Sequence, residues 1–385
     1  MTEPLARKPR LVLAATLAAL VPFLRIAPAA AQAPADTIVA DEAKSSRDAP
    51  ERLLRFRDSI VSWEHNFSAE TVGVGSDVQS KNPTYTMGLA GRGRYYLVDE
   101  KRDKVFVLGS LGLYREFTNS DSTTQRGETS LSDAELGLVY APRLRGTGGG
   151  DATLADLRAT LVVPTSKSSY DSGRYFAPGV GVGITQVTPL LQGRFRPDLS
   201  SMVRLAVSYQ HWFARATVPT NPSLERVRLT PEGRSLPGDQ LSGSSLISDQ
   251  ITFAARFALA FGEVVGWSTD FGIQPAWKYD VQDQVQLCGT VLTGCTTVSV
   301  GEDDSRYLVR TQFNTELTFH FHRGFSLEVG YGNVANQIAP DGHRRGIFYS
   351  PDAGFYVSLS LIPHELVASP ERSASAKRGP AAAQF

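Results

Sequence analysis

The residues of this chain that could do chemistry are charged side chains on one face of segments in which apolar and polar residues alternate. Such alternation is typical of β-strands, where successive side chains point to opposite faces. The same polar face carries Glu64, Arg94, Asp156 and Glu328. The site candidates on this face are Glu70, Arg92, Glu116, Asp133, Glu135, Arg158, Arg204, Arg256, Asp270, Lys278, Arg310 and Glu316.

Two interpretations of these charges stay open. They can pair with one another and stiffen a narrow interior, or they can line a path and select solutes, as rings of charged side chains do in channels. Acidic and basic residues nearly balance on this face, which argues against a strong preference for anions or cations.

Patterns for catalysis and cofactor binding are weak. The sequence has no Gly-x-Ser-x-Gly elbow and no His-Glu-x-x-His pair. His320 and His322 share a face, but no third metal ligand is visible, so a polar role at a rim is favoured. The GVGVG run at 179–183 is followed by no helix, which favours small residues at a bend or in tight inward packing over a phosphate loop. We therefore expect no enzymatic activity, no metal and no cofactor.

The only two cysteines lie close together, in LCGTVLTGC. Cys288 and Cys295 lie in a stretch rich in glycine and threonine, with no histidine nearby. In an exported protein this spacing predicts a local disulfide that closes a loop rather than a metal site.

The N-terminus predicts export. Arg7, Lys8 and Arg10 precede an apolar stretch and a run of small residues that ends at Ala31, so residues 1–31 match a signal peptide. Residues 32–61 are expected to form a periplasmic segment with one short amphipathic helix beginning at Pro50. With 39 basic and 39 acidic residues among 385, the chain has no net charge to attract nucleic acid.

From residue 62 onward the sequence predicts twelve strands. Their expected spans are 62–77, 82–99, 104–118, 130–142, 154–165, 176–190, 201–215, 249–263, 265–281, 305–322, 324–338 and 351–363. Alternate connections are long, and the others are tight turns except for residues 143–153, where a further hairpin is an alternative. Long loops on one side and short turns on the other are typical of outer-membrane barrels.

The stretch YLVRTQFNTELTFHFH, residues 307–322, indicates which face is inside. It is longer than the roughly 5–6 residues usual in soluble strands and can span a bilayer, which takes about 9–11 tilted residues. In lipid every backbone polar group must be paired, so such strands must close into a barrel. The apolar face then meets lipid, and aromatic residues concentrate at the two ends of that face. A soluble sandwich would invert the two faces.

The region 62–363 therefore resembles bacterial outer-membrane β-barrels, and the fold expected is an all-β, membrane-spanning, antiparallel up-and-down barrel. The segment from Asp352 to Leu359 is similar to a barrel-assembly signal, although residues 364–385 follow it as an expected disordered tail. The resemblance implies the outer membrane of a diderm bacterium as location. It also implies membrane lipid and the barrel-assembly machinery as partners.

A narrower resemblance covers residues 157–189, LRATLVVPTSKSSYDSGRYFAPGVGVGITQVTP. It is similar to the strand, loop and glycine-rich strand of putative transporters of the phenol meta-pathway outer-membrane family, with Ser166 where glycine is usual. This implies passage of small molecules, including aromatic or other hydrophobic solutes. The alternative is a closed barrel that acts structurally or through its long outer loops.

Overall fold

The computed structural model of the chain describes thirteen stretches, which together contain every strand of the barrel. They are residues 55–72, 84–100, 102–118, 127–146, 151–191, 199–217, 245–280, 284–288, 295–299, 306–322, 324–338, 344–350 and 353–367. The signal peptide, most of the expected periplasmic segment and most of the expected tail lie outside these stretches and stay predictions.

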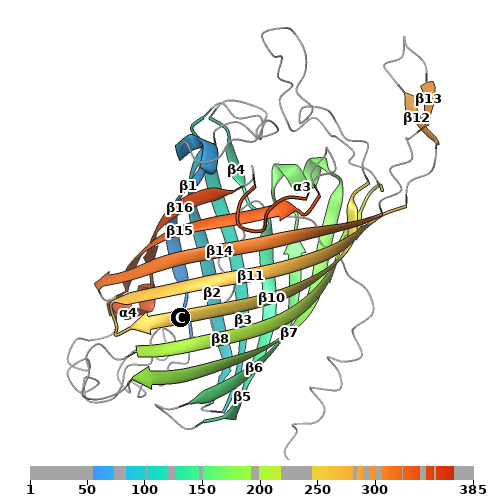
Figure 1. Cartoon of the computed structure of the whole chain (residues 1–385). Helices are drawn as coiled ribbons and strands as arrows, with labels where there is room; N and C mark the ends of the chain where they lie inside the picture. Colours follow the sequence, from blue (N-terminus) through green and yellow to red (C-terminus); the bar gives the residue numbers. More distant parts are fainter. Residues whose placement is uncertain are drawn as a thin grey trace, which may run out of the picture.

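The described chain forms a closed antiparallel barrel of twelve strands (Figure 1). Each strand pairs with the next in the chain, and the last pairs with the first, which leaves no open sheet edge. The strands are β1 (Ile60–Ser68), β2 (Tyr85–Asp99), β3 (Asp103–Glu116), β5 (Ala134–Arg145), β6 (Ala152–Val163), β7 (Arg174–Leu191), β8 (Leu199–His211), β10 (Ile247–Phe261), β11 (Val265–Lys278), β14 (Tyr307–His322), β15 (Phe325–Asn336) and β16 (Gly354–Leu361).

Short elements lie in the connections between the barrel strands. Strand β4 (Thr129–Leu131) pairs with β3, and β9 (Phe213–Ala214) pairs with β7. The hairpin β12 (Gln284–Cys288) and β13 (Cys295–Ser299) forms a separate two-stranded sheet. The helices are η1 (Ala69–Val72), α3 (Lys167–Asp171) and α4 (Pro363–Val367), and no helix in the described stretches is long and apolar enough to cross a bilayer.

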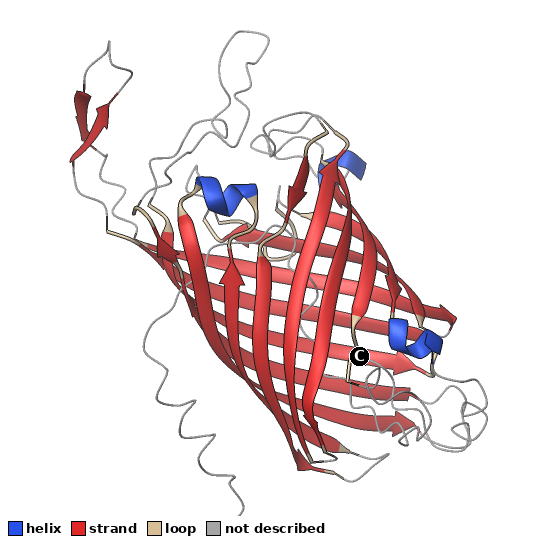
Figure 2. Ribbon diagram, turned by 180° about the vertical axis from the view of Figure 1, so that it is seen from behind, coloured by secondary structure: helices blue, strands red, loops and turns tan. Residues whose placement is uncertain are grey.

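The two ends of the barrel differ in their connections. One end carries the long connections, residues 69–84, 117–133, 164–173, 212–246, 279–306 and 337–353, and we call it the outer end. Figures 1 and 2 show α3 and β4 at this end and α4 at the opposite, inner end. The inner end carries the short connections, residues 100–102, 146–151, 192–198, 262–264 and 323–324.

The prediction of twelve strands is confirmed, because each expected segment overlaps one barrel strand, with ends that differ by a few residues. At the doubtful connection 143–153, β5 ends at Arg145 and pairs directly with β6, which begins at Ala152. A further hairpin at that position is therefore wrong.

The start of the expected helix, residues 50–54, lies outside the described residues, and the helix does not continue into residues 55–61. Residues 55–58 form a turn and β1 begins at Ile60, so the chain is already extended where the helix was expected to continue. Asp58 has φ 60°, a left-handed conformation that aspartate tolerates and an α-helix does not contain. Strand β1 must pair with both β2 and β16 to close the barrel, and this pairing overrides the local helical pattern.

The turn before β1 packs against the inner end of β2. The Tyr96 backbone N–H donates to Arg55 O at 2.8 Å, and the Tyr96 hydroxyl donates to Asp58 Oδ2 at 2.6 Å. The Arg57 guanidinium lies 4.4 Å from the centre of the Tyr96 ring and pairs with Asp99. The chain therefore enters the barrel along its inner mouth.

The two faces of the wall have opposite chemistry. Large apolar side chains are exposed on the outward face, among them Leu89 at 54%, Leu205 at 54% and Val182 at 53%. Charged side chains are buried on the inward face, among them Arg204 at 5% and Glu316 at 6% exposure. This is the inverse of a soluble sandwich, which buries its apolar face.

Candidate functional site

A band of charged side chains runs along the inner wall near the middle of its strands, and we call it the belt. Strand pairing brings its members together, because the strands that carry them lie in one consecutive run of the wall. The order of that run is β6, β7, β8, β10, β11, β14, β15, β16 and β1. The belt consists of Glu64, Asp156, Arg158, Arg204, Arg256, Asp270, Glu316 and Glu328.

The first cluster of the belt lies over the glycines of β7. Asp156 Oδ1 accepts from Arg158 Nη2 at 3.0 Å and from Arg204 Nη2 at 2.9 Å. A Cβ at Gly181 would lie 3.0 Å from the Arg158 Cγ, and one at Gly183 would overlap the Asp156 carboxylate. The GVGVG run therefore allows these charged side chains to lie along the wall, which confirms the expected tight inward packing.

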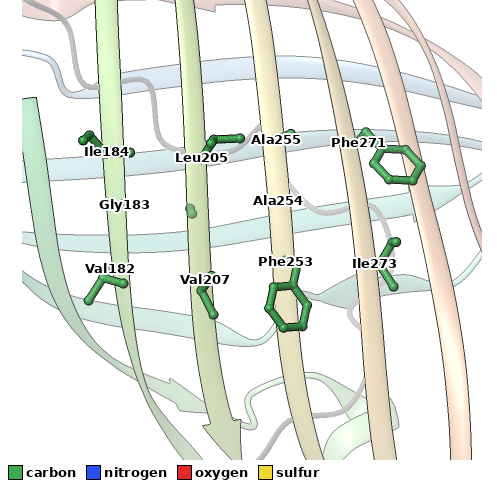
Figure 3. Close-up of a pocket in the computed structure, with 11 residues that line it drawn as sticks. Val182, Gly183, Ile184, Leu205, Val207, Phe253, Ala254, Ala255, Phe271 and Ile273 are labelled. Carbon is green, nitrogen blue, oxygen red and sulfur yellow. The ribbon is translucent and has the colours of Figure 1, made fainter. Parts of the chain in front are cut away.

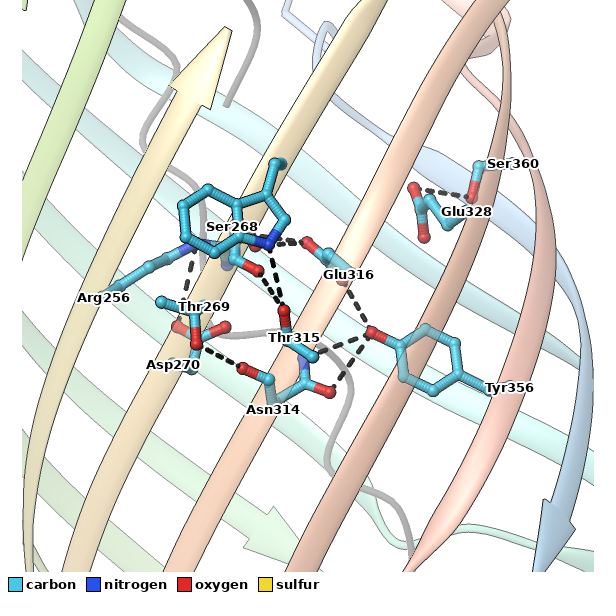
Figure 4. Close-up of polar contacts among 11 residues, drawn as sticks. Arg256, Ser268, Thr269, Asp270, Asn314, Thr315, Glu316, Glu328, Tyr356 and Ser360 are labelled. Atoms are coloured by element: carbon cyan, nitrogen blue, oxygen red, sulfur yellow. Dashed lines mark hydrogen bonds and ion pairs between the residues drawn. The ribbon is translucent and has the colours of Figure 1, made fainter. Parts of the chain in front are cut away.

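The second cluster is centred on Arg256 (Figure 4). Arg256 Nη2 donates to Glu316 Oε1 at 2.8 Å and to Ser268 Oγ at 2.9 Å, and its Nε lies 3.7 Å from Asp270 Oδ1. These atoms come from β10, β11 and β14, because Arg256 is opposite Asp270 and Ser268 is opposite Glu316 in the strand register. The guanidinium thus joins three neighbouring strands.

Tyr356 on β16 extends this cluster along the wall. Its hydroxyl donates to Glu316 Oε2 at 2.8 Å and accepts from Asn314 Nδ2 at 3.2 Å. A Cβ on Gly330 would overlap the Tyr356 ring, so glycine at this inward position lets the ring lie flat across β15. Figure 4 shows the phenol beside Glu316 and Asn314.

The remaining members of the belt, Glu64 and Glu328, have hydroxyl partners. Ser62 Oγ and the Tyr114 hydroxyl donate to Glu64 at 2.9 and 3.3 Å, and Ser360 Oγ donates to Glu328 at 3.4 Å. Neither carboxylate forms an ion pair within the described residues.

Two more of the predicted residues are inward on neighbouring strands. Arg92 on β2 is opposite Ser110, which is opposite Glu135 on β5. Closer to the inner end, Arg94 is 4% exposed and its guanidinium lies 5.5 Å from the centre of the Phe106 ring. The inward side there is apolar, a cluster of Tyr96, Phe106, Leu108, Val139, Ala141 and Leu154.

The other predicted residues lie towards the outer end. Asp133 accepts from Ser166 N at 2.9 Å and from Ser169 Oγ at 2.6 Å, which anchors the start of α3. Arg310 Nε donates to Asn336 Oδ1 at 3.0 Å.

Glu116 is 2% exposed at the outer end of β3, and Lys278 ends β11. Glu70 lies in η1, outside the barrel strands. These positions are away from the belt, and the role of all twelve candidates as lumen-lining residues stays a prediction.

The histidines and cysteines singled out in the sequence lie on β14 and on the hairpin of β12 and β13. His320 and His322 lie at the inner end of β14, and no group of three or more His, Cys, Asp or Glu in the described part of the chain could hold a metal. Cys288 and Cys295 are opposite each other in the register of β12 and β13. The disulfide itself stays a prediction.

Three uncharged partners of the carboxylates were not predicted from the sequence: Tyr114, Tyr356 and Ser268. For the two tyrosines, the signal in the sequence is a glycine on the inward face of a neighbouring strand. Tyr114 covers Gly88 and Gly112 as Tyr356 covers Gly330. Only the register between strands shows which ring lies over which glycine.

The outward surface behind the belt has a shallow apolar hollow of about 470 Å³ (Figure 3). It surrounds Ala255 and is walled by larger side chains, including Leu205, Phe253 and Phe271. The hollow and the belt lie on opposite faces of β8, β10 and β11. At this height along the barrel, the wall is thus apolar on its outward face and charged on its inward face.

No protein-family model and no curated protein sequence matches the chain. Among solved structures it is similar to an outer membrane channel from Pseudomonas putida F1, with 11% identity over 79% of this chain and 93% of that chain and a TM-score of 0.45. The KdgM porin in complex with disordered oligogalacturonate matches at 8% identity, 78% and 98% coverage and a TM-score of 0.30.

The transport unit of the autotransporter AIDA-I from Escherichia coli matches at 7% identity, 83% and 93% coverage and a TM-score of 0.37. The barrel assignment rests on the strand pairing of this chain.

Proposed function

We propose that the protein is an outer-membrane channel through which small solutes pass along the belt. The observation that carries this proposal is the inverted wall, apolar and exposed outside, charged and buried inside. A bilayer is the solvent that matches such an outer face, and a closed barrel satisfies its backbone polar groups there.

Two features favour a path over a filled interior. A barrel of eight strands is just wide enough for side chains to fill, and twelve strands enclose more room. The Asp156–Arg158–Arg204 cluster and the Tyr356 ring lie along the wall over glycines of the neighbouring strands. Such an arrangement supports a narrow passage bordered by polar groups.

The chemistry of the belt favours small polar solutes. Its described side chains present guanidinium, carboxylate, hydroxyl and phenol groups to the lumen. Passage of aromatic solutes, implied by the resemblance of residues 157–189, remains a finer prediction. Export by the signal peptide and insertion by the barrel-assembly machinery belong to the same proposal.

Conductance of the purified full-length protein in a planar lipid bilayer tests the proposal. We expect discrete current steps in KCl, because an open lumen passes hydrated ions. Protein that inserts, migrates differently before and after boiling on a detergent gel, and yet gives no steps would contradict the channel. That result would favour a closed barrel that acts through its outer loops.

A further inference from the structure

The inward face of β15, β16 and β1 differs from the rest of the belt. Glu328 is opposite Ser358, and Ser358 is opposite Glu64, so the three residues form one row across three adjacent strands. Neighbouring strands are about 4.8 Å apart, which places the two carboxylate-bearing residues about 10 Å apart across the serine. We call this row the acidic row.

The acidic row holds a serine hydroxyl with no hydrogen-bond partner among the described residues. Ser358 is 4% exposed, and its side chain is inward because its neighbour Leu359 is exposed on the outward face. Within the described residues no hydrogen bond involves the Ser358 hydroxyl. Buried polar groups normally have a partner, so a solute or water is the expected partner here.

The charges of the belt are compensated unevenly. Arg158, Arg204 and Arg256 each have a carboxylate within 4 Å, in Asp156 or Glu316. Glu64 and Glu328 receive hydrogen bonds only from hydroxyl groups. Glu64 and Glu328 are therefore the two carboxylates of the belt without a guanidinium partner among the described residues.

We infer that Glu64, Ser358 and Glu328 form a subsite for small organic ammonium ions on the path through the barrel. An ammonium group has three N–H donors, which matches two carboxylates and one hydroxyl oxygen. A calcium ion needs 6–8 oxygen ligands, and the described residues provide no group of three acidic or histidine ligands. This inference rests on the proposed channel and names the solute class that it favours.

The test compares wild type with the double variant Glu64→Gln, Glu328→Gln in planar bilayers. Under a KCl gradient the wild type should prefer cations, and millimolar methylammonium chloride should reduce the potassium current. The double variant keeps the side-chain size and removes both charges. Its cation-to-anion permeability ratio should fall by about fivefold, the factor for unit charges ~4 Å apart in water.

Glu263→Gln is the matched control. It makes the same substitution on the exposed inner turn between β10 and β11, away from the acidic row, and should leave the ratio unchanged. If the double variant does not fold, Glu328→Gln replaces it, since Ser360 is the only hydrogen-bond partner of Glu328 in the described chain.

The outcomes separate the two proposals. Wild-type protein that conducts without cation preference, or variants that keep the wild-type ratio and methylammonium sensitivity, would overturn the subsite and leave the channel standing. Wild-type protein that inserts without conducting would overturn both. A lower ratio and lost methylammonium sensitivity in the variant alone support the subsite.

Discussion

Arg256 is the residue on which the largest cluster of the belt depends. Its guanidinium is 7% exposed and compensates Glu316, with Asp270 beside it. Removing one partner of a buried ion pair leaves an uncompensated charge, which typically costs ~3–5 kcal/mol. We expect Arg256→Met to lower the free energy of unfolding by an amount in this range, measured by urea unfolding in lipid vesicles.

The double variant Arg256→Met, Glu316→Gln serves as the control. Replacing a buried pair with neutral groups is often close to neutral in stability, so the second change should restore much of the loss. If Arg256→Met unfolds at the wild-type urea concentration, the cluster is solvated in the lumen and does not stabilise the wall.

At the scale of an element, β7 depends on its inward glycines. A Cβ at Gly183 would overlap the Asp156 carboxylate, and the Arg204 Nη2 would lie 3.2 Å away. We expect Gly183→Ala to cost ~1–3 kcal/mol, the usual range for overpacking, measured as the folded fraction in vesicles. Gly93→Ala is the control, because its nearest atom would be Gly109 O at 4.0 Å. Equal losses in the two variants would contradict flat packing over β7.

The rim segment, residues 344–350, lies over the outward face of β15. Asn333 is 0% exposed there, donating to Ile347 O at 2.8 Å and accepting from Ser350 Oγ at 2.5 Å. Phe313, opposite Asn333 on β14, packs against Phe348 with ring centres 4.9 Å apart. An amide on the outward face is therefore satisfied by a segment of the chain instead of facing lipid.

Asn333→Leu should release the rim segment. The substitution removes the hydrogen bonds to Ile347 O and from Ser350 Oγ, a loss of ~1–3 kcal/mol for buried groups. In reconstituted protein we expect faster tryptic cleavage after Arg344 and Arg345 than in wild type. The same change at Asn336, which bonds Arg310 at the rim, should leave the cleavage rate unaltered. Equal rates in wild type and Asn333→Leu would show that these hydrogen bonds do not hold the segment.

Across the whole molecule, the period-two pattern predicted the twelve strands and their two faces. The lengths of the connections predicted the asymmetry of the two ends, and the need to pair backbone groups in lipid predicted which face turns inward. The sequence pattern could not predict which charged side chains pair with each other. Glu316 and Arg256 lie on strands separated by β11, and their contact depends on the registers through that strand. Turn lengths and bulges set those registers, such as the shift between Ile247 and Asp249 in β10. Barrel closure also explains why the chain is extended from Ile60, at the start of β1, although the local sequence favoured a helix there.

The solvent that surrounds the whole barrel can be identified from substitutions at two depths of its outward face. Leu317 is 44% exposed on the outward face of β14, and Leu131 is 43% exposed in β4 towards the outer end. A basic residue facing lipid at the midplane costs ~2–4 kcal/mol, falling to ~0–1 near the interfaces. Leu317→Arg should therefore sharply reduce the folded fraction in lipid vesicles, whereas Leu131→Arg should fold almost as wild type. Similar folding of both variants would mean that water, and not hydrocarbon, meets the outward face at both depths. The inverted wall would then need a protein partner to cover it.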